Sequence, residues 1–298
     1  MHRNISALLF SLLVINLTSA QAFDLKGTLK DALKKQTDTS QTNPTNQPNT
    51  SSKPNTDANI AGINLSDPSQ DDEIKIGREI AGNILGAAPL VKDAGLQKYV
   101  NQVGRWVASQ SERPDLPWHF GVIESDDINA FAAPGGYVLI TKGLYKKLED
   151  ESQLAGVLGH EIGHVVKKHH IKVLQKSQLL NLGANLLGAS VGKNNQSVQT
   201  LIGHGAEISA RGLDKDAEFE ADRVGLTLST RSGYEPYGLV DILQILSLTN
   251  KSDSSVALLY KTHPSPDDRL EKLADAAGNK LDNIKDGKLL SSRLYKLK

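Results

Sequence analysis

The sequence contains no cysteine, a single methionine and few aromatic residues, which fill 5% of its 298 positions. Without a thiol the chain cannot form disulfides, carry a cysteine-linked lipid anchor, or act as a cysteine protease or a cysteine-ligated zinc protein. It also lacks an excess of either charge: 34 basic residues balance 34 acidic ones, so no overall field favours nucleic acid or an acidic membrane. The 39% of hydrophobic residues is ordinary for a soluble globular protein.

The first 22 residues have the pattern of a secretory signal peptide. A short polar start with Arg3 precedes a nearly apolar stretch at 5–17, and Ala20-Gln-Ala22 is a typical cleavage pattern. The alternative is a membrane anchor, but the apolar stretch is shorter than the roughly 20 residues that a span needs. We therefore expect a mature chain that starts at Phe23, has no transmembrane span, and lies in a bacterial periplasm or peripherally on the outer membrane.

Residues 23–70 are expected to lie outside the folded domain. Leu25, Leu29 and Leu33 form one helical stripe in a short amphipathic segment, which is read as a marginal helix or a weak docking segment. The stretch 36–59 is almost entirely Thr, Asn, Gln, Ser and Pro, which cannot build a core, so it is interpreted as a disordered linker. Globular composition begins near Asp71, and the domain is expected to span 71–298.

Within that domain the hydrophobic pattern predicts an α+β fold. Apolar residues recur at helical spacing around 76–84 and 96–107, and alternate with polar ones at 118–122. Residues 129–134 and 137–141 read as two short strands joined through Pro and Gly. Nearly everything after Glu149 appears helical, so a small β-sheet is expected to pack on a mostly helical body.

The central chemical motif is His160-Glu161-Ile-Gly-His164. Residues i and i+4 share one face of a helix, so both imidazoles can reach one metal ion, while Glu161 beside them can take a proton from the water that the metal activates. A string of this kind also arises by chance on solvated helices, but Leu154, Leu158 and Ile162 give this helix a buried face.

Catalytic zinc usually needs a third protein ligand. Glu218, Ala221, Asp222 and Gly225 fall on one face of a later helix. Glu218 can supply the ligand, Ala221 and Gly225 are small enough for close helix approach, and Asp222 can accept the free N–H of a ligand histidine. The alternative is a charged, solvated helix face, which Glu220 and Arg223 are expected to provide.

Four ordered motifs make the chain resemble the gluzincin zinc peptidases related to HtpX and the CAAX prenyl endopeptidases. Beside the two helix motifs, residues 129–138 are similar to the family's N-A-F-A-x-P-G-G segment, and 262–269 to its T-H-P-x-x-x-x-R element. The likeness runs from about 71 to 276 and is closest to the soluble periplasmic members, since no multiple spans are present. It implies a zincin-type domain that binds one zinc ion through His160, His164 and Glu218.

The resemblance also implies peptide-bond hydrolysis with Glu161 as general base. Arg269, His263 and Tyr234 remain alternatives for stabilising the oxyanion, and His263 could instead swing onto the zinc and switch the enzyme off. The expected substrates are unfolded or misassembled envelope proteins, with the outer-membrane assembly machinery as a further partner. The alternative function is a periplasmic chaperone or assembly factor for outer-membrane proteins with little or regulated proteolysis.

Overall fold

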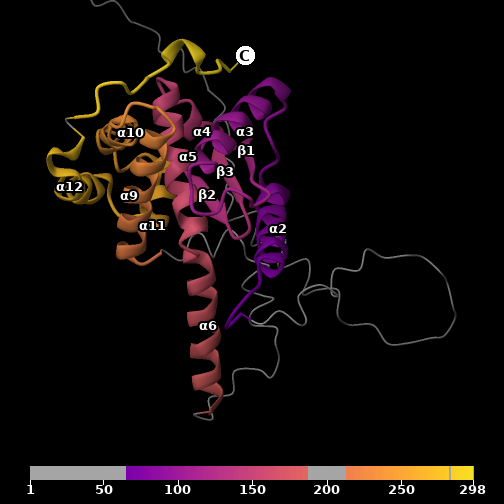
Figure 1. The fold of residues 1–298 in the computed structure, drawn as a ribbon. Coiled ribbons are helices and arrows are strands. Elements are labelled where there is room, and N and C mark those ends of the chain that lie inside the picture. Colours follow the sequence, from indigo (N-terminus) through magenta and orange to yellow (C-terminus); the bar gives the residue numbers. More distant parts are fainter. Residues whose placement is uncertain (1–64, 187–212, 282, 298) are drawn as a thin grey trace, which may run out of the picture. The chain divides into compact units, whose positions relative to one another are not determined.

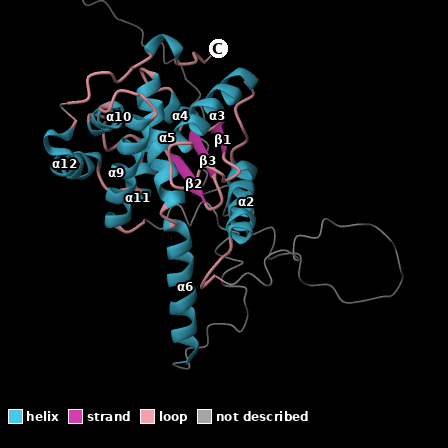
Figure 2. Ribbon diagram, viewed as in Figure 1, coloured by secondary structure: helices cyan, strands magenta, loops and turns pink. Residues whose placement is uncertain are grey.

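The part of the chain that the structure describes is mostly helical and contains one small sheet (Figures 1 and 2). In this computed structural model the described residues are 65–186, 213–281 and 283–297. All of them belong to one compact unit, Thr42–Lys298. The expected signal peptide and most of the segment at 23–70 lie outside the described residues. Among the described helices, none is both long enough and apolar enough to cross a membrane.

The helices are α2 (Gln70–Ala87), α3 (Ala94–Ala108), α4 (Lys142–Tyr145), α5 (Glu151–Val166), α6 (His169–Leu186), α9 (Lys215–Arg231), α10 (Gly238–Ser247), α11 (Leu259–Thr262) and α12 (Pro266–Ala277). The strands are β1 (His119–Ile123), β2 (Ala130–Ala133) and β3 (Tyr137–Thr141). Three short 3₁₀ turns are η1 (Ser254–Val256), η2 (Gly278–Lys280) and η3 (Ser291–Arg293). The predicted α+β class is confirmed: the three described strands follow α2 and α3 and precede the other helices.

The sheet has the strand order β1-β3-β2. β1 pairs with β3 in parallel, whereas β2 and β3, the two short strands expected on either side of the Pro-Gly-Gly turn, pair antiparallel. Gly135 and Gly136 adopt φ values of 75° and 101°, a conformation that side chains disfavour. This tight turn leaves β2 at one edge of the sheet.

α5 lies at the centre of the fold, and each of its 16 residues is buried. It packs against α9, α10, α3 and the edge strand β2, so it has no solvent-facing side. The helix begins where the Asp150 side chain accepts a hydrogen bond from the Gln153 N–H at 2.9 Å. Burial on all sides explains how polar residues of α5 come to lie in the interior of the protein.

α5 and α9 approach each other through small residues. A Cβ added to Gly225 would lie 2.6 Å from the His160 backbone nitrogen, and one added to Gly159 would lie 2.8 Å from the Gly225 carbonyl oxygen. The expectation that Ala221 and Gly225 permit close approach is therefore confirmed, and glycines on α5 contribute equally. The contact brings the side chains of α9 beside those of the His-Glu-x-x-His motif.

The end of α5 is set by a residue in the left-handed conformation. Lys168 has φ = 56°, which breaks the helix before α6 begins at His169. Its Nζ lies 2.7 Å from Oε1 of Glu73, a buried residue of α2, and the other Glu73 oxygen accepts from Arg113 at 2.8 Å. These ion pairs hold the turn and link α2 to the end of the central helix.

Candidate metal centre

Four side chains converge where α5, α9 and the α11–α12 connection meet. Ligand atoms of His160, His164, Glu218 and His263 all lie within 4.8 Å of one another. The two Nε2 atoms of His160 and His164 are 3.0 Å apart, and the Glu218 oxygens lie 3.6 and 3.5 Å from them. The structure thus brings together the three ligands predicted from sequence and adds His263 as a fourth donor.

The donor set fits a divalent cation. Both Glu218 carboxylate oxygens are buried and have no hydrogen-bond partner among the described residues. Burial raises the pKa of Glu218 well above its ordinary value, and burial lowers the pKa of both His160 and His164. Two neutral imidazoles facing an unpaired carboxylate are costly without a positive charge between them. Nitrogen and carboxylate ligands of this number suit zinc.

His160 is oriented from behind by Asp222. Its Nδ1 lies 2.7 Å from Asp222 Oδ1 and 3.1 Å from Nη2 of Arg269. The shorter contact, to the carboxylate, favours a hydrogen on Nδ1 and leaves the Nε2 lone pair facing the cluster. Arg269 in turn donates to both Asp222 oxygens, at 2.9 and 2.6 Å. Burial opposes ionisation of Asp222, but Arg269 and His160 outweigh it and hold the pKa of Asp222 well below its ordinary value.

This arrangement changes the interpretation of two oxyanion candidates. Arg269 is buried with its guanidinium occupied by Asp222, so it is placed to orient Asp222. Tyr234 donates its hydroxyl hydrogen to Glu151 at 2.9 Å. Glu151 is at the opposite end of α5 from the motif, about 13 Å from His160 at the helical rise. Tyr234 was one of three alternatives for stabilising the oxyanion, and the bond from its hydroxyl to this distant buried carboxylate argues against that role.

His164 has an outer partner that the sequence analysis missed. Its Nδ1 lies 2.9 Å from Nδ1 of His169, whose Nε2 lies 3.1 Å from the Glu220 carboxylate. Glu220 was expected on a solvated helix face, and its side chain is 40% exposed, but it also contacts this buried ring. The available signal was the pair His169-His170, which follows the motif after residues 165–168.

Glu161 lies within the buried helix beside the ligands and is not part of the four-residue cluster. None of the described residues forms a hydrogen bond or ion pair with its carboxylate. Burial raises the pKa of Glu161 to about 8. A cation at the cluster would oppose this rise, because a nearby positive charge favours the ionised carboxylate. A buried carboxyl group whose pKa depends on the charge beside it is suited to general-base chemistry.

His263 approaches the cluster from the connection between α11 and α12. Its Nε2 lies 3.7 Å from a Glu218 oxygen, and its Nδ1 is 2.7 Å from the Thr262 hydroxyl. Thr262 also contacts Asn129, the residue before β2, at 3.4 Å. The ring therefore presents Nε2 to the same space as the other ligand atoms, which is the geometry required of a fourth ligand.

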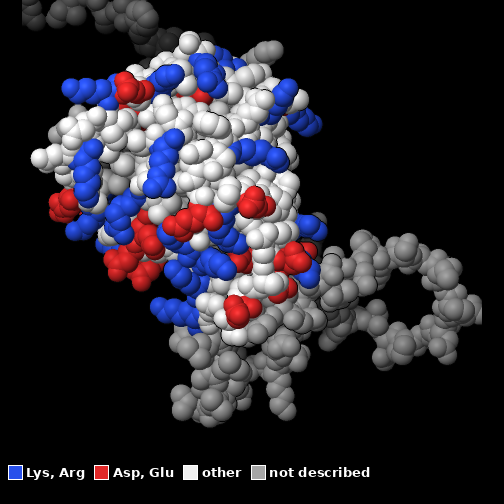
Figure 3. Space-filling view, in the orientation of Figure 1, with Lys and Arg blue, Asp and Glu red and all other residues white. Residues whose placement is uncertain are grey.

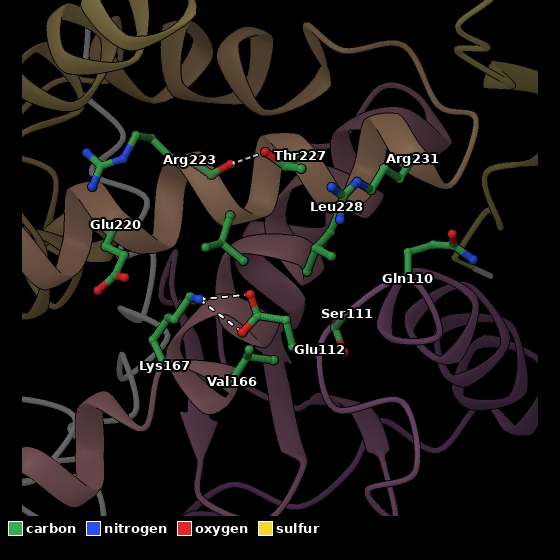
Figure 4. A pocket seen from close by; sticks show the side chains of 11 residues that line it. Gln110, Ser111, Glu112, Val166, Lys167, Glu220, Arg223, Thr227, Leu228 and Arg231 are labelled. Atoms are coloured by element: carbon green, nitrogen blue, oxygen red, sulfur yellow. Dashed lines mark hydrogen bonds and ion pairs between the residues drawn. The ribbon is translucent and has the colours of Figure 1, made fainter.

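A separate cavity of about 330 Å³ lies between α9 and the loop after α3 (Figure 4). None of the four clustered residues lines it, but Glu220 does, together with Lys167 and Arg223. Lys167 is held by both Glu112 oxygens at 3.1 Å. The face of the molecule shown in Figure 3 carries basic and acidic side chains side by side, in keeping with the balanced composition.

Comparison with known proteins matches residues 94–277 to the model of peptidase family M48. The chain is 31% identical over 234 residues to a beta-barrel assembly-enhancing protease of Yersinia pestis, covering 76% of this chain and 47% of that protein. It is 28% identical over 161 residues to metalloprotease YcaL of Escherichia coli, covering 53% and 62%. It is 27% identical over 177 residues to mitochondrial metalloendopeptidase OMA1 of Schizosaccharomyces pombe, covering 59% and 52%. The chain thus spans about half the length of these relatives.

Proposed function

The chain belongs to peptidase family M48, and from this premise we propose that it is a zinc-dependent endopeptidase of the bacterial cell envelope. Its reaction is the hydrolysis of peptide bonds in misfolded or misassembled envelope proteins. The observation that carries the proposal is the convergence of His160, His164 and the buried Glu218, whose carboxylate oxygens have no hydrogen-bond partner among the described residues, on the helix that also carries the buried Glu161. Metal binding explains why His160, His164 and Glu218 lie together, and hydrolysis explains why Glu161 lies beside them.

One zinc ion per chain is held by His160, His164 and Glu218. When bound, zinc supplies Lewis-acid chemistry, since it polarises the scissile carbonyl and lowers the pKa of water toward about 7. Glu161 accepts the proton of the attacking water on its carboxylate and returns it to the amine that leaves. Asp222 and Arg269 keep His160 in the required tautomer. His263 either latches the cluster in the resting state or stabilises the oxyanion.

An extended substrate adds as a strand beside β2, which is an outer strand of the sheet among the described residues. β2 lies at the edge of the sheet and packs on α5, so a chain beside it passes close to Glu161 and the ligand cluster. Recognition through backbone hydrogen bonds requires no particular side chains. This mode suits the clearance of unfolded proteins with many sequences.

The N-terminal sequence and the relatives support the location and partners that we propose. A cleaved signal peptide over residues 1–22 delivers the chain to the periplasm, where misassembled outer-membrane proteins and their assembly machinery are its partners. The name of the Yersinia pestis relative, a beta-barrel assembly-enhancing protease, supports this substrate class. Proteomics of envelope proteins retained by the Glu161→Gln variant tests it directly, because a variant that cannot cleave should hold its substrates.

The metal site is tested by the zinc content of the purified full chain and of two single variants. We expect one zinc ion in wild type and its loss in His164→Ala and in Glu218→Ala, because each substitution removes one of three ligands. Casein hydrolysis should be lost in parallel. Full retention of zinc in both variants would overturn the ligand assignment.

A further inference from the structure

The tautomer of His164 decides whether the cluster is ready for a metal. The Nε2 atoms of His160 and His164 are only 3.0 Å apart. If His164 carried its hydrogen on Nε2, it would donate that hydrogen to His160 and the two rings would satisfy each other. If the hydrogen is on Nδ1, both Nε2 lone pairs face the cluster and can bind a cation. An acceptor for the Nδ1–H of His164 is therefore required.

His169 provides that acceptor. Its Nδ1 is 2.9 Å from Nδ1 of His164, and its side chain is buried. Two Nδ1 atoms at this distance need one hydrogen between them, so the rings must hold complementary tautomers. The hydrogen on His169 is drawn to the opposite nitrogen, because Nε2 lies 3.1 Å from a carboxylate oxygen of Glu220. His169 Nδ1 is thereby left as an acceptor.

We propose that His169 and Glu220 form a positioning pair that holds His164 in its metal-binding tautomer. The inference rests on the proposed metal site and deepens it. Glu220 accepts from Nε2 of His169, and Nδ1 of His169 accepts from Nδ1 of His164. This order mirrors the other side of the cluster, where Arg269 holds Asp222 and Asp222 accepts from His160. The tautomer of each ligand histidine is thus set by a carboxylate: by Asp222 directly for His160, and by Glu220 through His169 for His164.

The backbone places His169 for this contact. On a helix that continued past Val166, residue 169 would point about 140° away from His164, since each residue turns about 100°. The left-handed Lys168 interrupts α5 and lets the His169 ring return toward the motif. The ion pair from Glu73 to Lys168 secures that turn. The buried carboxylate of Glu73 thus fixes Lys168, the residue directly before His169.

His170 supplies a matched control. It is the next residue, is also buried, and its ring lies 5.9 Å from that of His164, close to the 5.1 Å separation of the His164 and His169 rings. It forms no hydrogen bond with His164. Removing His170 deletes a buried imidazole of equal size beside the same ligand, whereas removing His169 deletes the acceptor as well.

The first test uses the metal-free full chain and the ¹⁵N chemical shifts of its histidine rings, which report the tautomer directly. Wild type and His170→Leu should show His164 with its hydrogen on Nδ1. His169→Leu should shift His164 toward the Nε2–H form, and His169→Asn should restore the wild-type state because its Oδ1 can replace the lost acceptor. An Nδ1–H tautomer of His164 that persists in His169→Leu would overturn the proposal.

The second test measures zinc affinity by competition with a chromophoric chelator. His169→Leu should bind zinc about 10- to 100-fold more weakly than wild type, the range for loss of an outer partner of a metal ligand. His170→Leu should match wild type, and His169→Asn should recover most of the loss. Equal affinity in wild type and His169→Leu would overturn this inference alone. Failure of wild type to bind zinc would instead overturn the proposed metal site, and the tautomer measurement would still decide the role of His169.

Discussion

Asp222 is a single residue whose two oxygens orient both His160 and Arg269. Asp222→Ala should reduce zinc affinity or turnover by roughly 10- to 100-fold, because His160 loses the acceptor that sets its tautomer. It should also destabilise the fold by about 3–5 kcal/mol, since the buried Arg269 is left without its partner. Zinc titration and chemical denaturation measure the two effects separately.

Asp222→Asn is the informative control for this prediction. The amide oxygen can still accept from His160, but the charge that compensates Arg269 is gone. Zinc affinity should therefore recover toward wild type while stability remains reduced. If Asp222→Ala matched wild type in both zinc titration and turnover, the residue would have no supporting role at the metal site.

Some residues of the candidate site could be predicted from the sequence, and others could not. His160, His164 and Glu218 were predictable because their spacing on two helices and their residue types fit one metal ion. The role of Arg269 could not be predicted, because the sequence does not show which buried carboxylate its guanidinium contacts. His169 was missed because a continuous helix would have directed it away, and the turn at Lys168 has neither glycine nor proline to mark it.

At the scale of elements, the contact between α5 and α9 sets the position of Glu218 and Asp222. Gly225→Ala would place a Cβ 2.6 Å from the His160 backbone nitrogen, so the two helices must move apart. We expect a loss of stability of about 1–3 kcal/mol from overpacking. Zinc affinity should fall as well, because the shift carries both α9 carboxylates away from α5.

Gly82→Ala is the matched control for the helix contact. Gly82 is an exposed helical residue of α2, and a Cβ there would meet nothing within 4 Å. Alanine should therefore raise stability by up to about 1 kcal/mol through its higher helix propensity and leave zinc binding unchanged. A Gly225→Ala variant that behaves like Gly82→Ala would contradict the close packing of α5 on α9.

The connection between α11 and α12 carries His263 to the cluster, where its Nε2 is 3.7 Å from Glu218. As a fourth ligand it would occupy the position that water and substrate need. We therefore predict that His263→Ala raises basal casein hydrolysis while zinc is retained. An exposed histidine of β1 serves as control, since His119→Ala should leave the activity unchanged. A fall in hydrolysis for His263→Ala would support the oxyanion role and remove the latch.

The elements themselves were largely predictable. Apolar periodicity indicated α2, α3 and β1, and the Pro-Gly-Gly turn indicated the two short strands β2 and β3 on either side of it. The parallel pairing of β1 with β3 was not predictable, because it joins segments separated by β2 in the chain. The complete burial of α5 was also hidden, since its apolar stripe suggested a helix with one exposed face.

At the scale of the whole molecule, basic and acidic residues are balanced in number, and they lie side by side on the face that Figure 3 shows. The family match covers the metal site and the sheet that lies beside it. The chain spans about half the length of the relatives compared with it, so their substrates remain proposals for this protein. The described residues contain a buried cluster of possible metal ligands, with the carboxylate of Glu161 beside it, and peptide hydrolysis needs both.

The most direct measurement compares casein hydrolysis and zinc content of the full chain in wild type and Glu161→Gln. The amide keeps the size of the side chain and removes the proton acceptor, so the fold and the zinc content should be unchanged. Hydrolysis should fall by at least about 10²- to 10⁴-fold, the usual effect of losing a general base. A Glu161→Gln variant that retains zinc and cleaves casein at nearly the wild-type rate would contradict the proposed catalytic site.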